Sequence, residues 1–157
     1  MRFCLVIVAA ALAVGCGESS GCGPTDPQIC EANRSVARQL AGGWQEVGSP
    51  GGTNFVVTLA AHDASLIGSG SYASTSGMSG RTTILGIVSW RDSFFAPSGF
   101  EVPAAPTITL DFTFGNRTAR LDQATISGDT MNGAITFSED PFTTYVVKFS
   151  RVLPPAL

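Results

Sequence analysis

The sequence predicts an all-β domain built as an eight-stranded antiparallel up-and-down (meander) barrel. From residue 38 onward, turn-forming residues recur at intervals close to the 8–12 residues typical of β-sandwiches and barrels. Several segments alternate apolar and polar side chains, which is the period of a strand with one buried face. No connection is long and periodic enough to be the helix that a parallel crossover requires.

The eight expected strands are separated by good turn sequences, such as Ser-Pro-Gly-Gly and Glu-Asp-Pro. Alternation is clearest over residues 107–114, where Ile108, Leu110, Phe112 and Phe114 share one face. A meander of this size can remove its two free edges by curling into a barrel, and a two-sheet sandwich is the alternative. The expected strands are 40–47, 54–61, 66–74, 82–91, 107–114, 118–127, 130–138 and 143–152.

Length and composition set limits on the fold and on the partners. The chain has 157 residues, of which 44% are hydrophobic and 13% are charged, with a net charge of −3. This length suits one domain, and the apolar content argues against disorder over the whole chain. An acidic chain with one lysine, Lys148, lacks the basic patch that nucleic acids require, so we expect no nucleic-acid partner.

Residues 1–15 have the pattern of a secretory signal peptide. Met1-Arg2 provides a positive start, and the apolar run that follows is too short to span a membrane. The run ends in Ala-Val-Gly before Cys16, which resembles the cleavage and lipidation site of bacterial lipoproteins. That resemblance implies a lipid anchor on Cys16, and Gly17 in place of Asp favours the periplasmic face of the outer membrane. An ordinary secretory signal that ends near a cysteine is the alternative.

The polar, Gly/Ser/Pro-rich segment 16–37 is expected to be a tether that precedes a barrel domain of residues 38–153. Residues 31–40, where this segment meets the barrel, are the one candidate for a short helix. Cys22 and Cys30 lie eight positions apart in an oxidising compartment, so we expect them to form a local disulfide. A metal site is disfavoured because further ligands are lacking and the single histidine, His62, is distant in the chain.

One motif links the barrel to a known superfamily. Gly42-Gly43-Trp44 resembles the G-x-W motif of the calycins, which include lipocalins and avidins, and the likeness covers residues 40–152. It implies that Arg151 on the last strand packs across the Trp44 indole at the closed end of the barrel. Residues 66–74 are similar to the third strand of avidins, where Tyr72 and Ser74 would stand at biotin-binding positions. The scarcity of tryptophan departs from that pattern, so we do not expect biotin binding.

If Trp44 and Arg151 close one end, meander topology places alternate loops at the open end, or mouth. Inward side chains near the mouth would form an aromatic lining suited to a small apolar ligand. The alternative is that these aromatic side chains fill the narrow barrel. The expected lining residues are Phe55, Tyr72, Ser74, Phe112, Phe114, Phe137 and Tyr145.

The longest loop, residues 92–106, carries Phe94, Phe95 and Phe100 and is expected at the closed end. Long loops of this kind are often functional. We expect this one to fold down and cap the barrel floor; the alternative is that it presents its phenylalanines to a partner or a bilayer.

No catalytic residue, metal ligand or cofactor motif can be assigned, so we expect a binding protein and not an enzyme. The sequence predicts a lipid-anchored protein of the bacterial cell envelope whose barrel binds a small apolar ligand. The alternative is a protein-binding module that acts through its surface loops. One variant of it faintly resembles the bacterial metalloprotease inhibitors, which are small periplasmic barrels.

Overall fold

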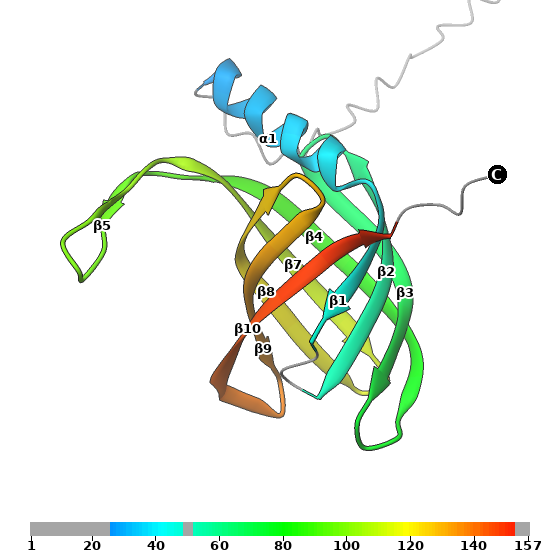
Figure 1. The fold of residues 1–157 in the computed structure, drawn as a ribbon. Helices are drawn as coiled ribbons and strands as arrows, with labels where there is room; N and C mark the ends of the chain where they lie inside the picture. Colours follow the sequence, from blue (N-terminus) through cyan, green and yellow to red (C-terminus); the bar gives the residue numbers. More distant parts are fainter. Residues whose placement is uncertain (1–25, 49–51, 153–157) are drawn as a thin grey trace, which may run out of the picture.

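The computed structural model describes residues 26–48 and 52–152, in which eight strands close into one antiparallel barrel (Figure 1). The strands follow one another around the barrel in chain order, and the first pairs with the last through Trp44 opposite Arg151. The predicted up-and-down barrel is confirmed, and the sandwich is excluded. The barrel strands are β1 (Gly42–Val47), β2 (Thr53–His62), β3 (Ser65–Ser74), β4 (Ser79–Arg91), β7 (Ala105–Phe114), β8 (Arg117–Ser127), β9 (Thr130–Phe137) and β10 (Asp140–Val152).

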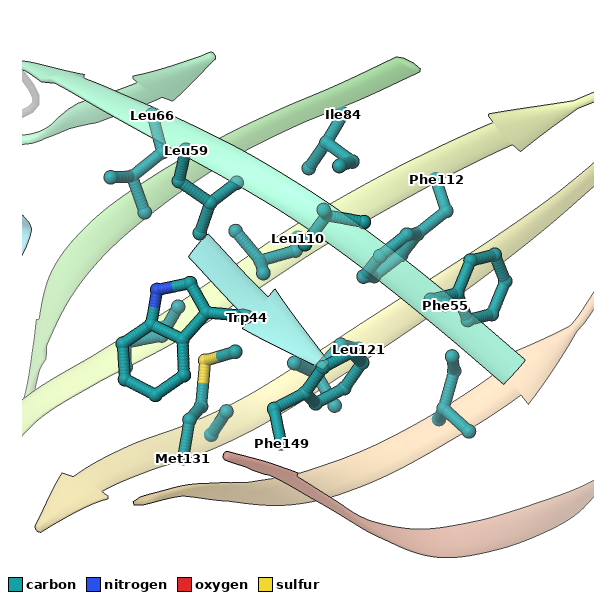
Figure 2. Packing of buried hydrophobic residues seen from close by; sticks show 14 of the residues in the cluster. Trp44, Phe55, Leu59, Leu66, Ile84, Leu110, Phe112, Leu121, Met131 and Phe149 are labelled. Atoms are coloured by element: carbon teal, nitrogen blue, oxygen red, sulfur yellow. The ribbon is translucent and has the colours of Figure 1, made fainter. Parts of the chain in front are cut away.

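Alternation along the strands produces a continuous apolar core inside the barrel (Figure 2). In β7, for example, Leu110, Phe112 and Phe114 are buried while Asp111 and Thr113 are exposed. Burial of these faces provides the main driving force for closure. The largest fully buried side chains of this core include Trp44, Phe55, Phe112, Phe114, Phe149, Leu66, Ile84, Leu110, Leu121 and Met131.

Helix α1 (Pro27–Leu40) covers one end of the barrel (Figure 1). Asp26 caps it by accepting a hydrogen bond from Gln28 N at 2.8 Å, and proline suits the first helical position. Ala37 and Leu40 are buried in the barrel core. The helix therefore begins before residue 31, and the part of the expected tether from 27 to 37 is helical. Among residues 26–48 and 52–152, no helical segment has the length and hydropathy of a transmembrane span.

Several expectations about the N-terminal segment concern residues that lie outside the described part of the chain. The signal peptide 1–15, Cys16 and Cys22 all lie in residues that the structure does not describe. Cys30 lies in α1, half-buried, and makes no disulfide within the described residues. The Cys22–Cys30 bridge therefore stays a prediction.

Arg151 joins α1 to the barrel. Its guanidinium carbon lies 4.4 Å from the centre of the Trp44 ring, and Trp44 Nε1 donates to Leu40 O at 2.8 Å. Arg151 also donates to Ala41 O and to Gln39 O at the end of the helix. These bonds satisfy carbonyls that a helix end leaves without partners, while the indole face attracts the cation.

The loop between β4 and β7 forms an ordered hairpin and does not cap the floor. Its strands β5 (Phe94–Phe95) and β6 (Glu101–Val102) pair with each other and project away from the barrel (Figure 1). We call residues 92–104 the arm. The expected floor-capping role is wrong, because α1 covers that end and Phe95 and Phe100 are 74% and 75% exposed.

Candidate functional site

The aromatic residues expected to line the mouth do lie together, but they pack against one another. The Phe55 ring lies 4.8 Å from that of Phe112 and 5.3 Å from that of Phe114, centre to centre. Phe137 adds a ring 6.3 Å from Phe114. All four are at most 5% exposed. Contacts of this kind stabilise a core, so this section of the barrel is filled by side chains.

Tyr72 lies across the mouth above this cluster. Its ring centre is 5.0 Å from that of Phe114. A Cβ added to Gly80 would lie 3.0 Å from the Tyr72 ring, and one added to Gly115 would lie 3.5 Å from its hydroxyl. Glycine at these two positions, one in β4 and one in the turn between β7 and β8, therefore leaves the space that the tyrosine occupies.

The other two expected mouth residues take part in polar contacts at the edge. Tyr145 packs on Phe137, with 5.9 Å between the ring centres, and its hydroxyl donates to Asp140 Oδ2 at 3.4 Å. Ser74 Oγ lies 2.9 Å from Ser76 Oγ. Tyr145 and Ser74 therefore form hydrogen bonds with residues close to them in the chain, Asp140 and Ser76.

Glu46 is a buried acid that the sequence interpretation missed. Its side chain is inside the barrel, with the residue 2% exposed, and Oε2 accepts a hydrogen bond from Phe55 N at 3.2 Å. Burial raises the pKa of Glu46 to about 7, and the Phe55 hydrogen bond opposes part of that shift. The signal was present in the sequence, because Glu46 stands two positions after the inward Trp44 on one strand.

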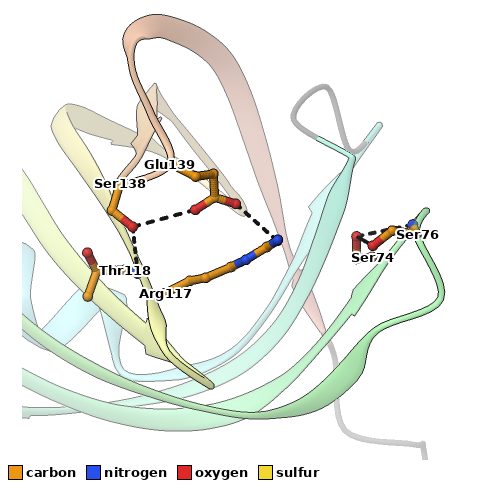
Figure 3. A network of polar contacts seen from close by, with 6 residues as sticks. All are labelled: Ser74, Ser76, Arg117, Thr118, Ser138 and Glu139. Atoms are coloured by element: carbon orange, nitrogen blue, oxygen red, sulfur yellow. Dashed lines mark hydrogen bonds and ion pairs between the residues drawn. The ribbon is translucent and has the colours of Figure 1, made fainter.

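A polar network connects the turns at the rim of the mouth (Figure 3). Arg117, at the start of β8, forms an ion pair with Glu139 at 3.0 Å. Thr118 N donates to Ser138 Oγ at 3.1 Å, which joins the same two turns. Both charged side chains are more than a third exposed, so the pair adds little stability.

A groove of about 460 Å³ lies beside this rim on the outer face of the barrel. The exposed side chains of Arg120 and Asp111, 3.8 Å apart, lie along it. A second hollow of about 310 Å³ shares Thr136 with the first, so the two adjoin over β8 and β9. The first groove is lined by Asp111, Thr118, Ala119, Arg120, Thr136, Phe137, Ser138 and Pro141; the second by Asp122, Gln123, Ala134, Thr136 and Thr144.

Two irregularities in strand pairing accompany these hollows. In β8 the register shifts between Asp122 and Thr125, and Gln123 takes the left-handed conformation with φ 49°. Asp122 Oδ1 accepts hydrogen bonds from Gln123 N and Thr109 Oγ1, both at 3.0 Å. In β10 the pairing with β9 is irregular between Asp140 and Thr144. Bulges re-aim side chains and are frequent next to functional sites.

Phe142 lies within the irregular part of β10, directly after the groove residue Pro141. Its side chain is 97% exposed, although it is large and apolar. The sequence interpretation missed it because the expected strand began at residue 143, whereas β10 begins at Asp140. The groove and Phe142 together form the candidate functional site.

The remaining sequence-based candidates carry no chemistry that can be assigned. His62 Nδ1 lies 3.9 Å from Asp63 Oδ2 on the surface, with its side chain 88% exposed. Within residues 26–48 and 52–152, no three His, Cys, Asp or Glu side chains are grouped so that they could hold a metal ion. No family model, curated protein or solved structure matches the chain.

Proposed function

We propose that the chain is a lipid-anchored protein of the bacterial cell envelope whose calycin-like barrel binds a protein partner through the outer groove and Phe142. One contrast supports this most directly: the rings inside the barrel are in mutual contact, whereas Phe142 is 97% exposed beside a groove of about 460 Å³. The stack of Arg151 on Trp44 supports the calycin resemblance.

The chemistry of the groove suits an extended polypeptide segment. Its lining combines hydroxyl groups with one basic and one acidic side chain, which can pair with backbone and side-chain polar groups of a partner. Phe142 would supply an apolar anchor, since aromatic and arginine side chains dominate the binding energy of protein interfaces. The barrel closes on itself, so a partner would be held by side chains and not by strand addition.

The apolar run before Cys16 supports the lipid anchor. The acylation state of Cys16 tests it. In the native host, mass spectrometry of the N-terminal peptide should show a chain that begins at Cys16 and carries acyl groups. The Cys16→Ser variant should lack them, because the thioether forms on the sulfur. A chain cut elsewhere and free of acyl groups would contradict the anchor without bearing on the groove.

Partner binding is tested by comparing variants on opposite sides of the barrel. The purified lipoprotein, with the Phe142→Ser and Arg120→Glu changes made separately, should retain a specific envelope protein at least about tenfold less well, since an interface anchor is worth roughly 2 kcal/mol or more. Crosslinking and quantitative mass spectrometry provide the measurement.

The matched control is Ile67→Ser on β3. Ile67 is 59% exposed on the outer face of another part of the barrel and lines neither hollow. The Ile67→Ser variant should retain as much of the envelope protein as the wild type. Equal capture by all variants, or equal loss with Ile67→Ser, would contradict binding through the groove.

A small apolar ligand at the mouth is a second candidate function, favoured by one specific observation. Glu46 places a buried carboxyl beside Phe55, where it could pair with a polar group of an otherwise apolar molecule. Uptake of an apolar probe by the wild-type barrel would favour this function over partner binding.

A further inference from the structure

The arm presents apolar side chains on both of its faces. Phe94 and Phe95 are consecutive in β5, so their side chains point to opposite sides of the hairpin. They are 43% and 74% exposed, and Phe100 beyond the turn is 75% exposed. A hairpin that packs on a protein surface needs one apolar face. Apolar side chains on both faces suit an apolar phase that surrounds the hairpin better than a protein surface, which would contact one face only.

The composition of the tip fits an apolar medium as well. Residues 93–100, Ser-Phe-Phe-Ala-Pro-Ser-Gly-Phe, carry no charge. Arg91 and Asp92 precede this run, and Glu101, which pairs with Phe95 across the hairpin, follows it. The Arg91 guanidinium lies 5.3 Å from the centre of the Phe94 ring, which ties the base of the arm together.

The backbone of the tip satisfies part of its own hydrogen bonding. Ala96 N donates to Phe100 O at 2.9 Å, and Gly99 N donates to Ala96 O at 2.8 Å. Pro97 has no N–H to satisfy. Unpaired backbone groups are the main obstacle to placing a chain among lipids, so this internal pairing lowers the free-energy cost of entry.

The arm lies at the same end of the barrel as the start of α1, and this position indicates that the apolar phase is the lipid bilayer. The arm projects from the end of the barrel that α1 covers (Figure 1). Asp26, at the start of α1, follows Cys16 by ten residues, which can span at most about 36 Å. A bilayer that holds an acylated Cys16 therefore lies within reach of this same end.

We propose that the arm inserts Phe94, Phe95 and Phe100 into the outer part of the phospholipid bilayer that anchors the chain. This inference rests on the lipid anchor in the proposed function. Cys16 and the arm then hold the α1 end against the membrane. The rim with Phe142, at the opposite end of β10, faces away from it, toward a partner.

The test uses the lipidated full chain reconstituted in phospholipid vesicles that contain brominated lipids, which quench nearby indoles. The Phe95→Trp variant should lose emission relative to the same protein in unbrominated vesicles. Phe142→Trp is the matched control, because Phe142 is also an exposed phenylalanine and lies at the other end of the barrel. The wild-type protein, with Trp44 and Trp90, gives the background signal.

Quenching in Phe95→Trp but not in Phe142→Trp supports the proposal. Unchanged emission in both variants, or equal quenching in both, overturns it. The proposal is also overturned if the emission of Phe95→Trp changes on addition of an envelope protein but not on addition of vesicles. That result would indicate a protein-binding arm. The N-terminal mass and the capture by groove variants are measured separately, so loss of the anchor or of the partner is distinguishable from failure of the arm.

Discussion

Replacement of Phe112 by alanine should lower the free energy of unfolding by about 3–5 kcal/mol, the usual cost of removing a buried phenylalanine. Phe112 is fully buried, and its ring lies 4.8 Å from that of Phe55 and 6.2 Å from that of Phe149. Its removal takes apolar contacts from both neighbours and leaves a cavity in the middle of the barrel. Urea unfolding at constant pH measures the change.

The same variant distinguishes a filled barrel from an open ligand pocket. If the interior is packed, a small apolar probe should bind to Phe112→Ala and stabilise it, while the wild type remains unaffected. Phe142→Ala, which removes an exposed ring, should change stability by less than about 0.5 kcal/mol. A loss below about 1 kcal/mol for Phe112→Ala, with probe uptake by the wild type, would contradict the packed interior and favour the ligand function.

The barrel was predictable because local signals agreed with one another along the chain. Strand 107–114 illustrates this: its alternation sorted Leu110 and Phe112 from Asp111 and Thr113, and the structure buries the first pair and exposes the second. Turn residues marked the strand ends to within a few positions. Closure was the favoured way for a meander to remove its free edges, but the sequence left a two-sheet sandwich open, and the pairing of β1 with β10 decides between them.

The features that were missed depend on information that alternation does not carry. The groove accompanies a register shift at Gln123 and another before Thr144, and a single extra residue in a strand has no distinctive composition. The arm was expected to fold onto the floor, but its two sides pair with each other as β5 and β6 and project from the barrel (Figure 1). The capping pair Asp26-Pro27 marks the start of α1, but it lies in a segment whose polar, proline- and glycine-rich composition is also typical of a tether.

Glu46 should make the stability of the protein depend on pH in a defined direction. The pKa of its carboxyl is raised from an ordinary value of 4.5 to about 7 in the folded state, because burial disfavours the charged form. Between these values the folded state binds more protons than the unfolded state, so the free energy of unfolding falls as the pH rises. Below pH 4.5 and above pH 7 this group contributes no further slope. The loss across the window is about 3 kcal/mol.

Glu46→Gln should remove this slope, because the amide keeps an oxygen that can accept from Phe55 N but cannot ionise. At pH 8 the variant should be more stable than the wild type, and at pH 4 the difference should largely disappear. Glu139→Gln provides the control, since Glu139 is 41% exposed and lies at the rim. Urea unfolding at a series of pH values gives the curves. Parallel curves for wild type and Glu46→Gln would mean that the folded barrel hydrates this carboxyl, and the mouth would then have to be open to water at Glu46.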